Sequence, residues 1–375
     1  MIIGVDIRPM AGPRTGIQEY TEQILAHMVA LAPEHQFKLF WSSFRGGAPD
    51  RAWMHLPNVQ LVQYRIPNNL LFLLGSIFSY PLIDDLIGGA DVFFSPHFFL
   101  APLSDACRRV TTFHDLSYLR FPEFFTWRKR WWHTIEMDPA RQARFSNQII
   151  SVSESTKIDL VEYYQIDPAN ITVIHSATRI SRPIDEVLLE LKKTHNLPRQ
   201  FILHVGTLEP RKNIIGLIRA FNILKSQSEY ENVELVLIGK EGWQFKKIFR
   251  EINKSPYKNQ IRYLGHLTQD LAAYYSLATL LVCPSFFEGF GFPVLEAMTC
   301  GTPVIVSANS SLPEVASDAG IYINPYDISE IAEALGIVLS DSVIRTRLIK
   351  KGLVQASKFN WADSARRTLD ILIKS

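Results

Sequence analysis

Residues 283–296 read Cys283-Pro-Ser-Phe-Phe-Glu288-Gly-Phe-Gly-Phe-Pro-Val-Leu-Glu296 and directly follow an apolar run at 280–282. The run predicts a buried strand, and the two glycines predict an open turn. Pro293 predicts the first turn of a helix reaching about Thr299, with Glu296 in that turn. N–H groups at a helix start bind hydroxyl or anionic oxygen, and a carboxylate accepts both hydroxyls of a sugar diol. The stretch indicates a sugar-nucleotide site; a strand, turn and helix with two solvated glutamates is the alternative interpretation.

A second group of charges follows a predicted strand at Phe201–Val205, in Gly206-Thr-Leu-Glu-Pro-Arg211-Lys212-Asn213. Apolar residues at helical spacing come next, with Asn213 as a candidate cap. Two cations are therefore expected at the carboxyl end of a strand, where open α/β sheets bind phosphorylated ligands. The planar fork of Arg211 and the point charge of Lys212 suit a diphosphate, and a solvated pair before a helix is the alternative.

The length and the periodicity predict the domain organisation. A chain of 375 residues exceeds one usual core, and strand-like runs alternate with helical periods in both halves. We expect two Rossmann-like α/β domains with parallel sheets, at 1–180 and 197–355, joined by a polar linker near 176–196. Residues 356–375 form a separate amphipathic helix in this prediction.

Composition excludes several classes of protein. A formal net charge of +2 gives no support for nucleic-acid binding. The three cysteines lack metal-ligand spacing and fit a reducing cytoplasm. The first residues enter a strand pattern without a basic region or cleavage site, so we expect no secretion. The longest apolar run, at 70–83, is too short to span a membrane and suits a buried or interfacial helix. The first strand lacks the G-x-G-x-x-G that a dehydrogenase would show, and no D-x-D triplet exists to seat a metal, so cations must neutralise a diphosphate.

Four motifs of the second half resemble family 4 glycosyltransferases, and most of all the bacterial mannosyltransferase-like branch that builds O-antigen polysaccharides. They are the two stretches above, Cys-Gly-Thr-Pro-Val-Ile at 300–305 and Ser-Ser-Leu-Pro-Glu-Val-Ala at 310–316. Motifs of the first half at 6–9, 14–20, 114–122 and 152–156 match as well, so the resemblance spans nearly the whole chain. It implies the GT-B fold, with two parallel sheets facing across a cleft and a last helix that crosses back to the N-terminal domain.

The resemblance also implies roles for particular residues. His114, Glu288, Arg211 and Lys212 are the implied catalytic residues. His114 would reach the transferred sugar, and Asp115 would orient its imidazole or cap a helix. Glu288 would face the sugar and Glu296 would hold the ribose. Backbone groups of Phe290, Gly291, Phe292 and Pro293 would bind sugar hydroxyls or the β-phosphate, and Gly16 and Gly206 would line the donor. Many relatives carry an arginine where this chain has Thr207, so phosphate contact from that point falls to Arg211.

The implied activity is a retaining, metal-independent transfer of a hexose, mannose or a 6-deoxyhexose such as rhamnose, from a GDP-sugar to a lipid-linked saccharide. A UDP-sugar-dependent transferase, a sugar-nucleotide epimerase and a catalytically silent binding subunit are the alternatives. The stretch Arg120–Trp132 interleaves aromatic rings with cations. It suits the anionic surface of the inner membrane, at its cytoplasmic face, as well as it suits a partly buried helix.

Overall fold

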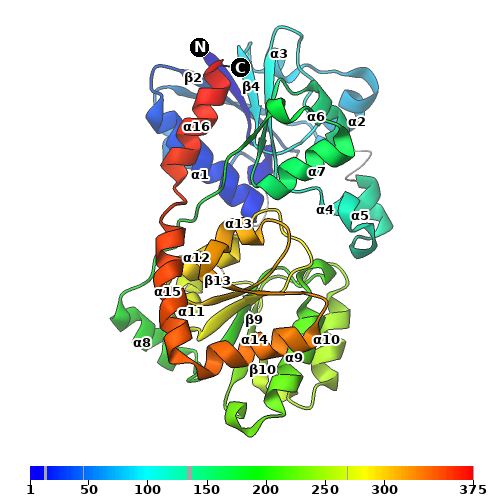
Figure 1. Ribbon diagram of the computed structural model, residues 1–375. Helices are drawn as coiled ribbons and strands as arrows, with labels where there is room; N and C mark the ends of the chain where they lie inside the picture. Colours follow the sequence, from blue (N-terminus) through cyan, green and yellow to red (C-terminus); the bar gives the residue numbers. More distant parts are fainter. Residues whose placement is uncertain (12–14, 45, 133–136, 268, 375) are drawn as a thin grey trace. The chain divides into compact units, whose positions relative to one another are not determined.

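The computed structural model describes residues 1–11, 15–44, 46–132, 137–267 and 269–374. The chain divides into two compact units: Met1–Ser176 with Asn360–Ser375, and Ala177–Phe359. Each unit is a parallel sheet flanked by helices, as Figure 1 shows. The predicted fold class, two Rossmann-like α/β domains, is confirmed.

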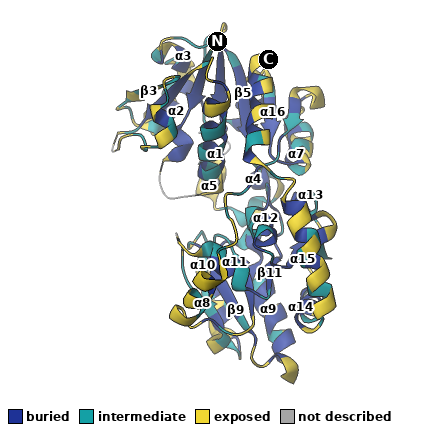
Figure 2. Ribbon diagram, turned by 90° about the vertical axis from the view of Figure 1, so that its left-hand side faces the viewer, coloured by how far each residue is buried: buried dark blue, intermediate teal, exposed yellow. Residues whose placement is uncertain are grey.

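The sheet of the first unit has seven parallel strands in the order β3-β2-β1-β4-β5-β6-β7. The strands are β1 (Ile2–Asp6), β2 (Gln36–Ser42), β3 (Val59–Tyr64), β4 (Val92–Ser95), β5 (Arg108–Phe113), β6 (Gln148–Ser151) and β7 (Ile171–Val173). The helices are α1 (Gly16–Leu31), α2 (Asn68–Phe78), α3 (Ile83–Leu86), α4 (Ser117–Arg120), α5 (Trp127–Trp131), α6 (Pro139–Phe145), α7 (Glu154–Tyr164) and α16 (Trp361–Lys374). The central strands β1 and β4 are buried almost throughout, because helices cover both faces of a parallel sheet. Figure 2 shows most strands of this sheet, among them β5, in the buried colour.

The sheet of the second unit has six parallel strands in the order β10-β9-β8-β11-β12-β13. The strands are β8 (Phe201–Val205), β9 (Glu234–Ile238), β10 (Ile261–Tyr263), β11 (Leu280–Cys283), β12 (Val304–Ser307) and β13 (Gly320–Ile323). The helices are α8 (Asp185–Thr194), α9 (Ile214–Lys225), α10 (Phe245–Lys254), α11 (Leu271–Leu277), α12 (Phe292–Thr299), α13 (Leu312–Ala316), α14 (Ile328–Ser340) and α15 (Ser342–Ala356). The strand order reverses between β8 and β11, and at such a switch point the loops after the strands leave a crevice for ligands.

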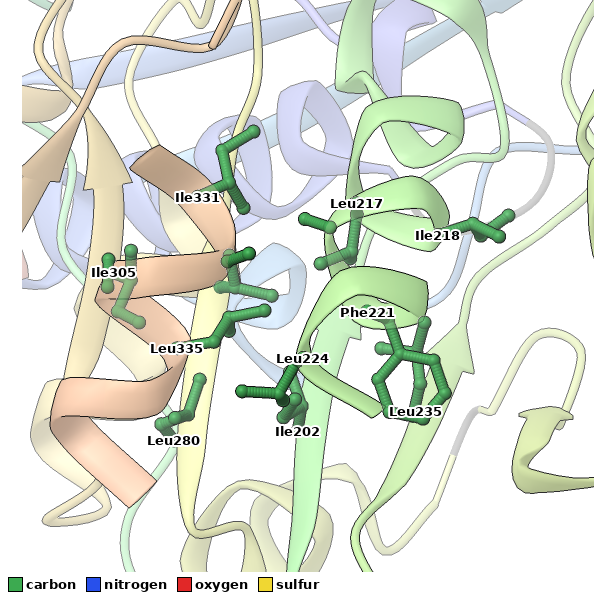
Figure 3. Close-up of a cluster of buried hydrophobic side chains, with 14 of the residues drawn as sticks. Ile202, Leu217, Ile218, Phe221, Leu224, Leu235, Leu280, Ile305, Ile331 and Leu335 are labelled. Atoms are coloured by element: carbon green, nitrogen blue, oxygen red, sulfur yellow. The ribbon is translucent and has the colours of Figure 1, made fainter. Parts of the chain in front are cut away.

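The core of the second unit confirms the helical period seen in the sequence. Leu217, Phe221 and Leu224 of α9 are buried together with Leu335 of α14, and Figure 3 shows these side chains meeting above β8 and β11. Burying one such side chain contributes about 1.5–3 kcal/mol, so this face of α9 fixes the helix on the sheet. The loop before α9, which carries Arg211 and Lys212, is thereby held in place.

The last helix, α16, belongs to the first unit. It packs beside α1, and the ring of Trp361 meets the ring of Tyr20 edge-on, with centroids 5.9 Å apart. The hydroxyl of Ser364 donates to the carbonyl of His175 at 2.7 Å. Leu372 and Trp361 are buried, so this contact has a hydrophobic core of its own.

Two segments differ from the simplest interpretation of the sequence. The apolar run at 70–83 is divided between α2 and α3, and Leu73, Ile77 and Phe78 of α2 are exposed. The expected linker contains α8, whose Leu188 is buried. No helix in the described parts of the chain is long and apolar enough to cross a bilayer.

Gly239, just after β9, allows two strand ends to approach closely beside the switch point. A methyl group on Gly239 would lie 1.8 Å from the carbonyl oxygen of Gly206, just after β8. We predict that Gly239→Ala lowers the free energy of unfolding by on the order of 3 kcal/mol, because backbone must move to relieve the overlap. Urea unfolding measures this. Gly47→Ala is the matched control, since an added methyl there would meet only Gln63 Oε1 at 3.9 Å; equal stability of the two variants would contradict the prediction.

Candidate functional site

The two charged motifs follow β8 and β11, the strands on either side of the switch point in the second unit. Both therefore lie at the carboxyl edge of this sheet. The loop after β11 leads into α12, which begins at Phe292 with Pro293 in its first turn. The prediction of a helix here is confirmed, but the prediction that Glu296 lies in its first turn is wrong. The helix starts one residue before the proline, so Glu296 is its fifth residue and lies in the second turn.

Glu288 joins the two motifs through its carboxylate. Lys212 Nζ donates to both Glu288 oxygens, at 2.6 and 2.8 Å, and Arg211 NH1 donates to Oε2 at 3.1 Å. Ser285 Oγ donates a further hydrogen bond to Oε1 at 2.6 Å. The side chains of Glu288 and Lys212 are only 7% and 10% exposed, so this is a buried ion pair with its oxygens well satisfied.

The two cations dominate the ionisation of Glu288. Burial alone would raise the pKa of the carboxyl, but the charges of Lys212 and Arg211 outweigh burial and lower the pKa to about 2. Glu288 is therefore ionised at every physiological pH. A carboxylate held in this way is a weak proton acceptor and a weak nucleophile, and its main effect is to fix the positions of the two cations.

Arg211 is held from two sides. Its Nε donates to Glu209 Oε1 at 2.9 Å, and its NH1 donates to the carbonyl of Phe287 at 2.6 Å. Glu209 and Glu288 together balance the charges of Arg211 and Lys212, so the cluster is neutral overall. The backbone of Phe286 donates to the carbonyl of Arg211 at 2.9 Å, which ties the loop after β11 to the loop after β8.

The neighbouring Asn213 occupies the N-cap position of α9 but does not cap it with its side chain. Its amide donates instead to the carbonyl of Pro325 at 2.6 Å, and its backbone adopts the left-handed conformation with φ 53°. The cap that the sequence suggested is thus a backbone turn.

The glycine-containing loop is supported by a third segment, after β12. Ser310 Oγ accepts from the Glu288 amide at 3.0 Å, and Ser311 Oγ donates to the carbonyls of Glu288 and Phe290. Asn309 donates to the carbonyl of Phe286. The sequence motif at 310–316 supported the family resemblance but gave these residues no role. Their contacts are non-local, and no local pattern predicts them.

Gly291 gives the loop its turn into α12. Its φ of 111° is accessible to glycine, and a methyl group there would lie 3.0 Å from Leu312 Cδ2. The amide of the next residue, Phe292, donates to no acceptor among the described residues, as expected for the first residue of a helix. Phe290 is buried against the ring of Phe292, with centroids 5.2 Å apart. Phe290 is thus packed inward, whereas Phe292 is partly exposed.

Glu296 contacts a neighbouring helix. Its Oε2 accepts from the hydroxyl of Tyr275, on α11, at 2.6 Å. Burial and the nearby carboxylate raise the pKa of Tyr275 well above its usual value, so the phenol stays protonated and donates. The sequence analysis did not single out Tyr275, because its contact with Glu296 joins two different helices.

His204, on β8, lies behind the cation cluster. Its Nδ1 donates to the carbonyl of Val282 at 3.1 Å, and its buried Nε2 has no hydrogen-bond partner among the described residues. Burial and the charge of Lys212 lower its pKa to about 4, so the ring is neutral at pH 7. Gly206 lies between them: a methyl group there would be 3.5 Å from Lys212 Cε and 3.7 Å from His204 Nε2.

His114 lies at the carboxyl edge of the other sheet, directly after β5. Its Nε2 donates to the carbonyl of Pro96, after β4, at 2.8 Å, and its ring meets that of Tyr20 edge-on at 4.8 Å. Burial lowers the pKa of the imidazole to about 4, so it is neutral at pH 7. His97, another residue that the sequence did not single out, has its ring centroid 5.6 Å from that of His114.

Asp115 and Gly16 have local roles in this unit. Asp115 Oδ1 accepts from the amide and the hydroxyl of Ser117, so its carboxylate caps the short helix α4. No hydrogen bond joins Asp115 to the imidazole of His114 in the described residues. Gly16 is the first residue of α1, after the capping side chain of Thr15. Its neighbours Gly12, Pro13 and Arg14 lie outside the described residues.

The structure therefore brings Gly206, Arg211, Lys212 and Glu288 together in one unit and places His114 and Asp115 in the other. The aromatic and cationic stretch has a mixed environment: Trp127 and Trp131 are exposed, whereas Arg120 is paired with the buried Asp159 at 2.6 Å. In the described residues, no three His, Cys, Asp or Glu side chains gather as metal ligands would.

Comparison with known proteins agrees with this geometry. Residues 14–182 match the family described as Glycosyltransferase Family 4, and residues 189–354 match Glycosyl transferases group 1. The chain is 32% identical to the O-antigen chain mannosyltransferase B of Escherichia coli over 283 residues, which is 74% of this chain and 73% of that protein. The serotype-specific mannosyltransferase WbdA of E. coli is 32% identical over 231 residues, but the match spans 60% of this chain and only 28% of WbdA.

Solved structures share the fold. Sucrose-phosphate synthase of Thermosynechococcus elongatus superposes with a TM-score of 0.78 over 100% of this chain and 98% of its own, at 20% identity. HepE of Anabaena, solved in complex with UDP and glucose, gives a TM-score of 0.74 over 100% of both chains, at 17% identity. At such identities the likeness concerns the fold alone.

We predict that Glu288→Gln lowers the free energy of unfolding at about pH 7 by about 3–5 kcal/mol, because it leaves buried cations without their counter-charge. The folded pKa of Glu288, about 2, lies below the usual 4.5, so its contribution is complete above about pH 4.5 and is lost as the pH falls toward 2. Urea unfolding of both proteins, from about pH 7 to about pH 3, measures this.

The difference between the two proteins should shrink over the acid part of that range. The control is Glu333→Gln, at an exposed position of α14 that no ion pair holds among the described residues. A loss for Glu288→Gln no larger than for this control would show that the buried pair does not stabilise the fold.

Proposed function

The chain belongs to glycosyltransferase family 4 and has the GT-B fold, and on that premise we propose that it transfers a hexose from a nucleotide sugar to a saccharide acceptor with retention of configuration. The observation that carries the proposal is the cluster of Arg211 and Lys212 on Glu288, at the switch point of the second sheet. In this proposal the cluster receives the diphosphate of the donor.

The hydrogen bonds of Lys212 support the assignment of the diphosphate to this cluster. Its ammonium carries three hydrogens, and in the described residues only the two oxygens of Glu288 accept from it. One donor is left for a phosphate oxygen. Glu288 keeps the ammonium in place before the ligand arrives, so that less conformational entropy is lost on binding.

In the proposed reaction, the bond between the anomeric carbon and the diphosphate oxygen breaks while a bond to the acceptor hydroxyl forms on the same face. The proton of that hydroxyl moves to the leaving diphosphate. Negative charge develops on the leaving oxygen, and fixed cations stabilise it more than they stabilise the bound donor. Arg211 and Lys212 supply this stabilisation. Glu288 acts through them, because its oxygens are occupied by hydrogen bonds.

Further contacts to the donor follow from the family resemblance. We assign the backbone of Phe290, Gly291, Phe292 and Pro293 to sugar hydroxyls or the β-phosphate, and Glu296 to the ribose. The unpartnered amide of Phe292, in the described residues, supports the first assignment, and the orientation of Glu296 by Tyr275 supports the second.

In the other unit, His114 is the proposed contact to the transferred sugar. Because Nε2 donates to Pro96, the imidazole has its lone pair on Nδ1 and can accept from a sugar hydroxyl. Gly16, at the start of α1, is assigned to close approach of the diphosphate. Asp115 fixes the turn that follows His114.

For the donor we propose GDP-mannose or a GDP-linked 6-deoxyhexose such as rhamnose, because the E. coli protein that matches over 74% of this chain is a mannosyltransferase. A UDP-sugar is the second candidate, favoured by the likeness of fold to HepE, which was solved with UDP and glucose. The acceptor would be a lipid-linked saccharide of O-antigen type at the cytoplasmic face of the inner membrane. The exposed Trp127 and Trp131 would contact that surface.

A panel of GDP- and UDP-sugars tests the proposal by binding and by slow hydrolysis. We expect one GDP-sugar to bind best, and we expect Lys212→Ala to weaken its binding roughly ten- to 150-fold, through loss of a charge-assisted hydrogen bond. Lys247→Ala, at an exposed lysine of α10, is the control. Unchanged affinity in both Lys212→Ala and Arg211→Ala would remove the diphosphate from this cluster, and turnover of a sugar nucleotide without acceptor would favour an epimerase.

Because cations of the protein are assigned to the diphosphate, we expect transfer to survive removal of divalent metals. Initial rates with and without excess EDTA should be equal within about a factor of two, since the phosphate charge is met by Arg211 and Lys212. Loss of activity in EDTA that magnesium or manganese restores would assign the phosphate to a metal.

A further inference from the structure

A polar pocket separate from the charged cluster lies in the first unit, away from the carboxyl edge of its sheet. Its volume is about 660 Å³, within the range of pockets that hold small molecules. Arg109 at the start of β5, Arg141 on α6 and Asn147 before β6 line it, together with the end of α2 and the loop between β4 and β5. His114 is five residues beyond Arg109 along β5, which corresponds to about 16 Å at 3.3 Å per residue. The pocket is therefore separate from the position assigned to the transferred sugar.

Arg109 is buried in the wall of this pocket, at 8% exposure, without a carboxylate partner. Its NH1 donates to Gln142 Oε1 at 2.5 Å and its NH2 to the carbonyl of Ala101 at 2.6 Å, both neutral acceptors. No carboxylate lies within ion-pair distance of its guanidinium in the described residues. Asp84 is the nearby carboxylate that raises the pKa of Arg109, but its oxygens accept from the amide and the hydroxyl of Ser104 and do not contact the guanidinium. A buried cation that no carboxylate contacts is costly, and an anion in the pocket would lower that cost.

Arg141 places a second guanidinium at the same pocket. Its NH1 donates to the carbonyl of Ser76 at 3.2 Å and its NH2 to Ser79 Oγ at 2.7 Å, again neutral groups. Burial, and to a smaller extent the charge of Arg141, lowers the pKa of Arg109 to about 10. Two like charges therefore face one cavity, and each raises the cost of the other.

The rest of the lining is mostly neutral. Asn147 Oδ1 accepts from the Arg109 amide at 2.7 Å, which leaves its NH₂ group as a donor with no partner among the described residues. Burial raises the pKa of the Cys107 thiol to about 12, so it carries no charge. Asp105 is the one carboxylate of the lining, and two cations outnumber it. Leu82, Leu103 and Phe145 add apolar surface, and Phe145 is 66% exposed at the rim.

From these contacts we propose that the pocket binds an organic phosphate monoester. The phosphate of the ester accepts hydrogen bonds from the guanidinium groups of Arg109 and Arg141 and from the side-chain amide of Asn147. The organic part of the ester packs against the apolar residues of the lining. Arginine forks match phosphate oxygens, and a phosphate carries the charge that balances two guanidiniums. Free glycerol 3-phosphate and the headgroup of phosphatidic acid share this chemistry. The site is independent of the one assigned to the donor.

The proposal is tested on the full chain by two binding measurements. One uses glycerol 3-phosphate in calorimetry, and the other uses flotation with phosphatidylcholine vesicles that contain or lack phosphatidic acid. We expect saturable binding in at least one of the two measurements. Binding of glycerol 3-phosphate in calorimetry would assign the pocket to a free phosphate ester. Binding seen only with vesicles that contain phosphatidic acid would assign it to a lipid headgroup. Arg141→Gln should weaken binding roughly ten- to 150-fold.

Matched variants make the outcome specific. Arg144→Gln changes an exposed arginine of the same helix outside the lining, and it should bind as the parent does. Lys212→Ala should also bind as the parent does, because it removes a cation of the donor site only. Arg109→Gln tests the buried guanidinium; where it does not fold, Asn147→Leu replaces it.

Three results would overturn the proposal. The first is absence of binding in both measurements. The second is equal loss in Arg144→Gln and Arg141→Gln, which would indicate general attraction to a basic surface. The third is binding that Lys212→Ala abolishes and Arg141→Gln leaves intact, which would place the phosphate in the donor site.

Discussion

The candidate site depends on one buried carboxylate. Glu288 lies in the loop that follows β11, and Lys212 and Arg211 compensate its charge within hydrogen-bonding distance. Neither the carboxylate nor the cations would be stable there alone, since an uncompensated buried charge is expensive. The pair therefore fixes two loops that are distant in sequence, and the serines at 310 and 311 fix the same loop from a third side. Hydrogen bonds and ion pairs thus hold the three charged groups in defined relative positions.

The fold was largely predictable from the sequence, because its signals are local. The period of the apolar residues at 214–224 gave α9 its buried face, and apolar runs before the two charged motifs located β8 and β11. Placing the cations beside Glu288 required the topology of the sheet as well, since parallel strands next to the switch point end at one edge. The position of Glu296 was wrong by part of a turn, because helix ends are poorly determined by sequence.

Other features could not be predicted, for physical reasons. His204 looked like a member of an apolar strand, and only the packing of β8 against β11 brings its ring close enough for the charge of Lys212 to lower its pKa. Tyr275 and Ser311 act through contacts between segments far apart in the chain. The sequence analysis gave Arg109 and Arg141 no role, and their hydrogen bonds to neutral acceptors are a property of the folded unit. In the sheet of the first unit, His114 therefore lies at the carboxyl edge, whereas Arg109 lies at the opposite end of β5.

The path of the chain has a consequence for how the molecule is made. The first unit is not a continuous segment: it needs α16, and α16 is synthesised after all of residues 177–359. During translation, residues 1–176 emerge with the groove beside Tyr20 still lacking Trp361 and Leu372. The second unit is a continuous segment, so it can complete its fold before α16, the last helix of the first unit, has been synthesised. Domains usually complete in order from the N-terminus; here the order is reversed, and the nascent first unit exposes apolar surface that a chaperone would recognise until the ribosome has nearly finished the chain.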